Sequence, residues 1–413
     1  MSGFDYDVAI VGAGPAGLAA ATELKQLGID RVVVLERAGQ AGGMPRHCGH
    51  PPFGLREFCR VLTGPSYARR LVRAARSAGV EIRTNVTVLA IAQQGGLDLA
   101  TPKGTQHLRV KRIILATGAR EQTRAQQLVP GLRPVGVMNT ATLQSFVYLE
   151  QLKPFKNPVI VGSELVSVSA LLTCLRHGMR PVALVEPEPH LRMHPALRIA
   201  VRLLRIPVYL GAQIAAIEGD KHVCGLRISI GQDDLMLACD GVVFSGRFTP
   251  EAALARVSGL GIDLGTQGPR VDMHGRSSNP HVFVAGNVIH PVETAGYCWA
   301  EGRRVAAAVA RDLSHAPAPQ SGLHIACGDG VSYVVPQRVS PRCEAVLNIR
   351  TQGAAEGRIV LTDAAGTELA SCRVRAYSQK PLRLHVPTLP DLSPGHVLQL
   401  RLQRKGHDAD PCA

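Results

Sequence analysis

The sequence predicts an α/β protein with two parallel-sheet folds of the same kind, followed by a small all-β domain. An apolar strand, a glycine-bearing turn and a helix follow one another from Tyr6, and the same order starts again at Pro158. Beyond residue 322 short strand-like segments alternate with turns, and helix patterns are absent. Strands that alternate with helices are typical of a sheet covered on both faces.

The first fold starts near the N-terminal end of the sequence. An apolar strand, Tyr6–Val11, leads into the turn Gly12-Ala13-Gly14-Pro15-Ala16-Gly17 and an alanine-rich helix, Leu18–Leu27. The three glycines allow a tight turn, close approach of the backbone to a pyrophosphate, and close packing of helix on strand. A second strand, Arg31–Leu35, ends in Glu36, where a carboxylate can accept a hydrogen bond from a ribose hydroxyl. This order predicts a Rossmann-like dinucleotide site.

Three later segments extend this fold. Arg112–Ala119 reads as a buried strand that ends in Thr117-Gly118, and Asn279–Asn287 is another strand that ends in Gly286-Asn287. A helix is expected from Ala300 to about Leu313. Each motif alone is compatible with an ordinary core strand and turn, but their order in one chain makes that interpretation weak.

Together these motifs resemble the FAD oxidoreductases with two dinucleotide-binding domains, the pyridine nucleotide-disulfide oxidoreductase-like superfamily, over residues 5–313. A tighter likeness is to bacterial flavoproteins encoded beside glycerol-3-phosphate dehydrogenases and to the FAD subunits of opine oxidase-type amine dehydrogenases. The motifs that carry it are Gly42-Gly43, Cys48 with Pro52-Phe53-Gly54, the segment Leu62 to Ala68, and the segment Thr117 to Arg124. Substrate identity does not transfer through such a likeness.

The resemblance implies FAD as the cofactor. Where relatives carry a Gly-Asp pair that binds the ribityl chain, this chain has Gly286-Asn287, whose amide can still hydrogen-bond hydroxyls without a charge. The expected FAD contacts are Gly12, Gly14, Pro15, Ala16, Gly17, Glu36, Arg37, Gly43, Arg46, Val86, Thr117, Gly118, Gly286 and Asn287.

The glycine loop of the second fold departs from the pattern. After the strand Pro158–Val161 it reads Gly162-Ser163-Glu164-Leu165-Val166-Ser167, so Glu164 stands where the register asks for glycine. Its side chain would fill the space of a pyrophosphate and repel it, which costs on the order of several kcal/mol. The second strand, Pro181–Val185, still ends in an acid, Glu186. We expect NAD(P)H binding to be lost, unless Glu164 turns outward.

The segment 42–54 supplies the candidate catalytic residues Cys48, His47 and His50. In related reductases this stretch lies near the flavin ring, and a cysteine falls at a similar distance after the ribose acid. Arg46, His47 and His50 would lower the pKa of the Cys48 thiol by stabilising the thiolate. The alternatives are that Cys48 only packs and that a histidine accepts a proton or contacts an anion. Farther along, Arg120, Glu121 and Arg124 are expected to brace the crossover or to form a salt-bridged surface.

Composition narrows the other possibilities. The ten cysteines include no Cys-x-x-Cys pair, so we expect neither a metal site nor an iron–sulfur cluster. The net charge of +14 is spread along the chain with few aromatic residues, which argues against nucleic-acid binding. Scattered thiols, the lack of a signal peptide and the lack of a long apolar run predict a cytoplasmic protein without a membrane span.

The expected domain organisation has four parts. They are an FAD domain (1–125 and 270–314), an NAD(P)-type domain (126–269), a linker (315–322) and a β domain (323–413). The β domain is expected to be an antiparallel sandwich that docks a second copy or another subunit, or serves only as a cap. Its expected strands are Val331–Pro336, Glu344–Arg350, Arg358–Thr362, Glu368–Ala376, Leu382–Val386 and Val397–Gln403.

The sequence thus predicts a flavoprotein dehydrogenase subunit. Electrons would pass from an amine, an opine, a polyol phosphate or a partner subunit through FAD to an acceptor other than NAD(P). One alternative is an NAD(P)H-dependent reductase that uses Cys48 as a redox thiol. Another is a non-catalytic assembly subunit that retains FAD as a structural element.

Overall fold

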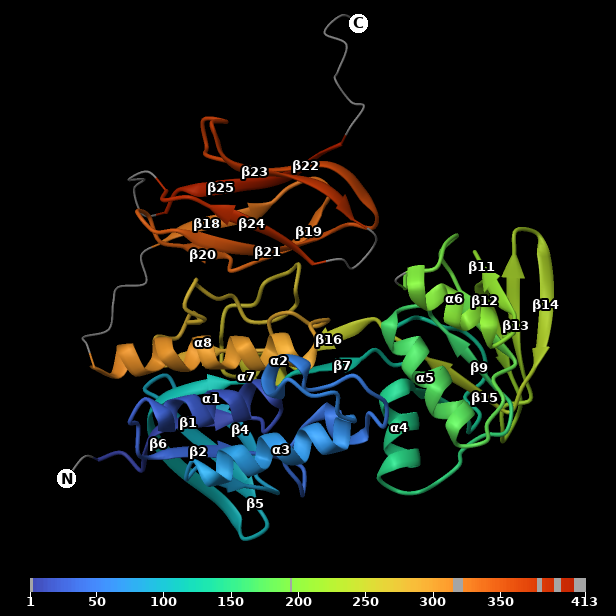
Figure 1. The fold of residues 1–413 in the computed structure, drawn as a ribbon, viewed down its shortest axis with the longest axis horizontal. Helices are drawn as coiled ribbons and strands as arrows, with labels where there is room; N and C mark the ends of the chain where they lie inside the picture. Colours follow the sequence, from blue (N-terminus) through green and yellow to red (C-terminus); the bar gives the residue numbers. More distant parts are fainter. Residues whose placement is uncertain (1–2, 194, 315–321, 377–380, 390–394, 405–413) are drawn as a thin grey trace, which may run out of the picture. The chain divides into compact units, whose positions relative to one another are not determined.

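The computed structural model describes residues 3–193, 195–314, 322–376, 381–389 and 395–404, which form two compact units (Figure 1). The first unit comprises Met1–Gly43, Arg70–Ala119 and Pro250–Ala413, and the inserted unit comprises Met44–Arg69 and Arg120–Thr249. Residues 44–69, which the sequence assigned to the FAD domain, thus group with the inserted unit, and the domain limits stay a prediction. The expected linker lies outside the described residues except for Gly322.

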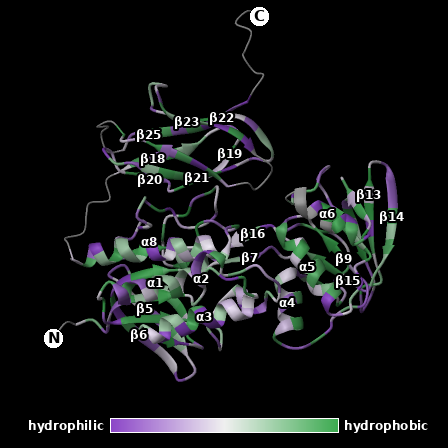
Figure 2. Cartoon of the chain, in the orientation of Figure 1, coloured by the Kyte–Doolittle hydropathy of each residue, from purple (hydrophilic) through white to green (hydrophobic). Residues whose placement is uncertain are grey.

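A seven-stranded sheet forms the centre of the first unit. Its order is β3-β2-β1-β6-β5-β4, and β17 also pairs with β6. The pairs among β1, β2, β3, β6 and β17 are parallel, whereas β4, β5 and the start of β6 form antiparallel hairpins. The parallel strands are rich in buried Val, Ile and Leu (Figure 2), as expected for a sheet covered on both faces. The strands are β1 (Tyr6–Val11), β2 (Val32–Leu35), β3 (Glu81–Arg83), β4 (Thr87–Ile91), β5 (Gly96–Thr101), β6 (Gly104–Leu115) and β17 (Val282–Val284).

Helix α1 (Pro15–Gln26) packs closely against α8 (Ala295–Ser314). A Cβ atom added to Gly302 would lie 2.1 Å from the carbonyl oxygen of Ala16, so only glycine permits this approach. Pro15 begins α1, where its fixed φ suits the first turn of a helix. The other helices that contain residues of this unit are α3 (Gly64–Ser77), which starts in the inserted unit, and α7 (Ala253–Val257).

The C-terminal part of the first unit is a two-sheet β domain with its own buried core. One sheet has the order β20-β18-β25-β22-β23, and the other has the order β19-β21-β24. All six expected strands are confirmed, but two more are present, and β18 pairs with β25 in parallel, which corrects the purely antiparallel expectation. The strands are β18 (Leu323–Cys327), β19 (Val331–Val335), β20 (Arg338–Val339), β21 (Ala345–Thr351), β22 (Ala355–Thr362), β23 (Glu368–Ala376), β24 (Leu382–Val386) and β25 (Val397–Arg404).

The inserted unit contains a five-stranded parallel sheet of order β11-β10-β9-β15-β8 and a three-stranded antiparallel sheet, β12-β13-β14. The two crossover segments, β7 (Ala119–Glu121) and β16 (Phe248–Pro250), pair with each other. The strands are β8 (Val137–Asn139), β9 (Pro158–Val161), β10 (Ala183–Glu186), β11 (Val208–Leu210), β12 (Gln213–Glu218), β13 (Gly225–Ile230), β14 (Asp233–Ala238) and β15 (Gly241–Phe244). The helices are η1 (Met44–His47), α2 (Leu55–Phe58), α4 (Thr140–Tyr148), α5 (Leu165–Arg176) and α6 (Pro195–Leu203).

The second Rossmann-like fold that the sequence predicts is therefore present in this unit. None of the helices that the structure describes is long and apolar enough to cross a membrane.

Candidate functional site

The first glycine loop, between β1 and α1, leaves room for a ligand. Gly12 has φ +106°, and a Cβ atom there would lie 2.4 Å from the carbonyl oxygen of Ala116, so the turn requires glycine. A Cβ atom on Gly14 or on Gly118 would meet no atom within 4 Å. The amide groups at the start of α1 therefore adjoin open space, as a pyrophosphate site requires.

The acid at the end of β2 adjoins this loop. Glu36 accepts hydrogen bonds from the amides of Ala13 and Ala38, each at 2.9 Å, so its carboxylate is fixed at the edge of the turn. Its carbonyl oxygen accepts a bond from the amide of Val86 at 3.0 Å. This arrangement places the Glu36 carboxylate beside the glycine loop, where it can accept a hydrogen bond from a ribose hydroxyl.

Gly43 and the Thr117-Gly118 turn lie in the same region of the first unit. A Cβ atom on Gly43 would lie 2.8 Å from the Cα atom of Gly14, so the two glycine segments touch. Thr117 donates its hydroxyl to the carbonyl oxygen of Glu251 at 2.7 Å, and the amide of Glu251 bonds back to Gly118 at 2.9 Å. The carboxylate of Glu251 is 3.6 Å from Arg37, another expected FAD contact.

The turn after β17 is held by acidic residues to which the sequence assigned no role. The amide of Gly286 donates to Glu301 at 2.8 Å. Asn287 uses both ends of its amide side chain on the backbone of Glu293, with both hydrogen bonds at 3.0 Å. The Asn287 side chain thus shapes the turn in addition to any contact with a hydroxyl.

Glu301 and His290 form a buried pair behind this turn, 3.3 Å apart. Burial alone would raise the pKa of Glu301, but His290, Arg304 and the amide of Gly286 outweigh it and hold the pKa at about 2. The Nδ1 atom of His290 is buried and has no hydrogen-bond partner among the described residues. The turn therefore rests on a carboxylate that stays charged at neutral pH.

The second glycine loop is filled by its own side chain. Gly162 has φ +104° and packs on Ser245, just as Gly12 packs on Ala116. Glu164, which is 3% exposed, forms an ion pair with Arg192 at 3.2 Å and accepts a hydrogen bond from the amide of Arg247 at 3.2 Å. A Cβ atom on Gly246 would lie 1.9 Å from this carboxylate. The expected alternative, in which Glu164 turns outward, is not what the structure shows.

Glu186, the acidic residue at the end of the second strand of this fold, is likewise occupied by hydrogen bonds within the protein. Ser163 donates its hydroxyl to Glu186, and the amide of Arg192 donates to the Ser163 hydroxyl at 2.9 Å. The other oxygen of Glu186 accepts a bond from the amide of Glu188 at 3.0 Å. In the first fold Ala13 stands where Ser163 stands here, and it offers Glu36 only its backbone amide.

The inserted unit contains the three candidate catalytic residues, Cys48, His47 and His50. It also contains one expected FAD contact, Arg46, whereas all the other expected FAD contacts belong to the first unit. The expectation of a lowered thiol pKa is wrong, because burial and the neighbouring Glu121 raise the pKa of Cys48 to about 12. Burial and Arg46 lower the pKa of His47 to about 4, so its imidazole is neutral at pH 7 and cannot stabilise a thiolate by charge. The thiol lies 3.5 Å from the side-chain oxygen of Gln144.

Arg124 and Glu121 have more specific contacts than sequence reasoning suggested. Arg124 donates to carbonyl oxygens of the loop 129–132, including Pro130 at 2.6 Å, so it braces that loop. Glu121 is 2% exposed and accepts hydrogen bonds from the amides of Ala141 at 2.7 Å and Gly246 at 3.1 Å. No group of metal-ligating side chains occurs among the residues that the structure describes.

Comparisons with known proteins agree with this geometry. The profile of the family "Pyridine nucleotide-disulphide oxidoreductase" matches residues 6–310. One of the opine oxidase subunits of Agrobacterium tumefaciens (strain Ach5) is 25% identical over 68% of this chain, a match that spans only 61% of that relative. The soluble pyridine nucleotide transhydrogenase of Hahella chejuensis is 24% identical over 76% of this chain and 72% of its own length.

Among solved structures, thioredoxin reductase from T. acidophilum superposes with a TM-score of 0.63 at 24% identity, over 75% of this chain and 99% of that one. This likeness concerns the fold alone. The open space beside Gly14 and Gly118, with Glu36 at its edge, fits the adenine dinucleotide cofactor of the family. The chain belongs to the pyridine nucleotide-disulphide oxidoreductase family and is an FAD-dependent oxidoreductase.

Proposed function

We propose that the chain is a dehydrogenase subunit that passes electrons through FAD to an acceptor other than NAD(P). The electrons come from a small organic substrate, which is an amine, an opine or a polyol phosphate, or from a partner subunit. The observation that carries this proposal is the buried carboxylate of Glu164, which fills the second glycine loop. A nucleotide pyrophosphate would have to displace that carboxylate and its ion pair with Arg192.

The residues of the first unit are suited to hold FAD. The pyrophosphate would bind at the turn of Gly12 and Gly14 and at the N-terminus of α1. Glu36 would accept a hydrogen bond from a ribose hydroxyl, and the Gly286-Asn287 turn would contact the ribityl chain. Bound FAD supplies the electron-accepting chemistry. The protein supplies position and charge around it.

The candidate catalytic residues take different roles in this proposal. Cys48 is a thiol rather than a thiolate at neutral pH, because its pKa is raised to about 12, so we assign it to packing. His47 is neutral, but burial and Arg46 hold its pKa at about 4, so its imidazole is a weak base at neutral pH. The nitrogen Nδ1 of His50 lies 2.9 Å from the carbonyl oxygen of Pro51. Because His47 is a weak base, His50 is the better candidate for proton transfer.

A second candidate function is an NAD(P)H-dependent reductase. The similarity to soluble pyridine nucleotide transhydrogenases favours it. The filled second loop and the raised pKa of Cys48 both count against it. A non-catalytic assembly subunit that carries FAD would keep the first site and show no flavin reduction by any donor.

The opine oxidase relative is named as one component of its enzyme, which indicates an enzyme with more than one kind of chain. We accordingly propose that this chain works with a partner subunit or a second copy, which docks on the C-terminal β domain. The nine cysteines among the described residues are all free thiols, which supports a cytoplasmic location.

Anaerobic titration of the flavin-loaded protein with NADH and NADPH tests the proposal. We expect no bleaching of the flavin absorbance at micromolar nucleotide, whereas rapid bleaching would refute the proposal. The Glu164→Gly variant should gain nucleotide binding, since it removes both the charge and the bulk from the second loop. Glu164→Gln is the matched control: it keeps the bulk, so it should gain little if occupancy of the space is what excludes the nucleotide.

A further inference from the structure

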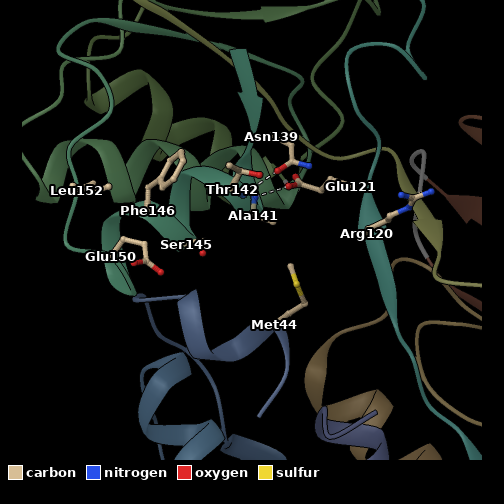
Figure 3. A pocket seen from close by; sticks show the side chains of 10 residues that line it. All are labelled: Met44, Arg120, Glu121, Asn139, Ala141, Thr142, Ser145, Phe146, Glu150 and Leu152. Atoms are coloured by element: carbon tan, nitrogen blue, oxygen red, sulfur yellow. Dashed lines mark hydrogen bonds between the residues drawn. The ribbon is translucent and has the colours of Figure 1, made fainter. Parts of the chain in front are cut away.

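A pocket of about 560 Å³ lies wholly within the inserted unit, around the N-terminal end of α4 (Figure 3). This volume is in the range of sites for small organic ligands, roughly 300–1,000 Å³, and the pocket is open to solvent rather than enclosed. Figure 3 shows Glu121, Asn139 and Thr142 gathered at the start of the helix, with Phe146 and Glu150 farther along. Its lining residues are Met44, Arg120, Glu121, Asn139, Ala141, Thr142, Ser145, Phe146, Glu150 and Leu152.

Glu121 is the buried charged group of this pocket. Its carboxyl oxygens accept hydrogen bonds from the amides of Ala141, on α4, and Gly246, which follows β15, so the side chain has one fixed position. Burial is the largest effect on its pKa and raises it to about 7, although both amides oppose the shift. The neighbouring titratable groups are Glu164, at the start of α5, and Cys48 after η1. Neither supplies a positive charge to Glu121.

The rest of the lining favours a cation over an anion. Of the ten lining residues two are carboxylic acids, Glu121 and Glu150, and one is a guanidinium, Arg120. Phe146 offers an aromatic ring, a surface that attracts organic cations. A phosphate dianion would face two acidic groups, whereas an ammonium ion would pair with them.

Two of the lining residues lie close in sequence to predicted FAD contacts. Met44 directly follows Gly43, and Arg120 is the second residue after Gly118. We propose that the pocket binds a small organic ammonium ion, as a simple amine or as an amino-acid derivative, with Glu121 as its counter-ion. This inference rests on the proposed dehydrogenase function and assigns its substrate to the amine and opine classes rather than to the polyol phosphates.

Binding of such a cation has a proton signature. The ammonium ion favours the ionised form of Glu121, so the neutral carboxyl group releases its proton to solvent while the ligand keeps its own. Because burial raises the pKa of Glu121 to about 7, part of this carboxyl group is protonated near neutral pH, and the release increases as the pH falls towards 6. A phosphate ligand would not release this proton.

Isothermal titration calorimetry of the flavin-loaded protein, in two buffers of different ionisation enthalpy, measures both affinity and proton release. The probes are pyrrolidine, N-methylglycine and glycerol 3-phosphate. We expect the two amines to bind with proton release and glycerol 3-phosphate to bind at least about tenfold more weakly. In Glu121→Gln the amine Kd should rise about tenfold and the proton release should vanish. Glu150→Gln is the matched control, because Glu150 is exposed; its amine Kd should rise less than about threefold, with the release retained.

Circular dichroism first establishes that both variants fold. Absence of amine binding, amine binding without proton release, an unchanged amine Kd in Glu121→Gln, or tighter binding of glycerol 3-phosphate would each overturn the inference. Flavin absorbance, recorded in parallel, separates this inference from the proposed function. Amine binding with proton release but with bleaching of wild-type flavin by NADH would leave the pocket assignment standing and overturn the proposed acceptor.

Discussion

Replacing Arg350 with alanine should destabilise the first unit and weaken its hold on FAD. Arg350, on β21, is 6% exposed and pairs with Glu293 at 2.5 Å, and it donates to the hydroxyl of Tyr333 at 3.2 Å. The backbone of Glu293 in turn forms two hydrogen bonds of 3.0 Å with the side-chain amide of Asn287. One guanidinium therefore connects the β domain to the turn that is expected to contact the ribityl chain.

The expected loss of unfolding free energy follows from the burial of the Arg350–Glu293 ion pair. The variant leaves the Glu293 carboxylate, whose side chain is 16% exposed, without its cation. Breaking a buried ion pair from one side costs about 3–5 kcal/mol, and the partial exposure of Glu293 places this case near the lower end. The matched control is Arg358→Ala in the same domain: Arg358 and its partner Glu368 are 48% and 44% exposed. Loss of an exposed pair costs less than about 1 kcal/mol.

Urea unfolding of both variants, followed by tryptophan fluorescence and by release of flavin, measures the difference. The midpoint should fall much further for Arg350→Ala than for Arg358→Ala, and only Arg350→Ala should raise the Kd for FAD. Equal midpoints in the two variants would refute the burial argument. A lower midpoint with an unchanged Kd for FAD would refute the link to Asn287. A double-mutant cycle with Glu293→Ala isolates the coupling between the two side chains.

Two further predictions concern titratable groups. The folded pKa of Glu301, about 2, is below that of an unfolded glutamate, so its contribution to stability is present above about pH 4.5 and is lost as the pH falls towards 2. Glu301→Gln should flatten the fall of the unfolding free energy over that window, and an unchanged pH profile would count against the His290–Glu301 pair. The second prediction concerns Cys48, whose pKa is raised to about 12, so iodoacetamide should alkylate it much more slowly at pH 8 than the exposed Cys59. Peptide mass spectrometry gives both rates, and faster labelling of Cys48 would contradict its assignment to packing.

The first glycine loop could be predicted from sequence because its signals are local. Gly12, Gly14 and Gly17 lie within six residues, and their spacing alone specifies a turn, a phosphate approach and a helix contact. The filled second loop was also predictable, since a glutamate at a glycine position has a direct steric consequence. What the sequence left open was the direction of the side chain, which depends on Arg192 and on the Gly246-Arg247 segment.

Residues whose environment is built from distant segments could not be assigned in this way. The cluster Arg46, His47, Cys48 and His50 suggests an activated thiol, but burial removes the water that a thiolate needs, and burial is a tertiary property. Glu121 is close in sequence to neither Gly246 nor the Cys48 segment, so the sequence predicted only that it braces the crossover or belongs to a salt-bridged surface. Strand β18 was missed for a similar reason, because its parallel partner β25 lies far along the chain.

The contact between Gly302 and the backbone of Ala16 has a consequence for biosynthesis. During translation the first helix emerges long before its partner α8, because the whole inserted unit is made in between. Until synthesis reaches roughly the last quarter of the chain, the face of α1 that packs on α8 stays exposed in the nascent protein. Premature termination between Asn287 and Ala295 should therefore yield a product that chaperones and proteases recognise, even though it contains every expected FAD contact.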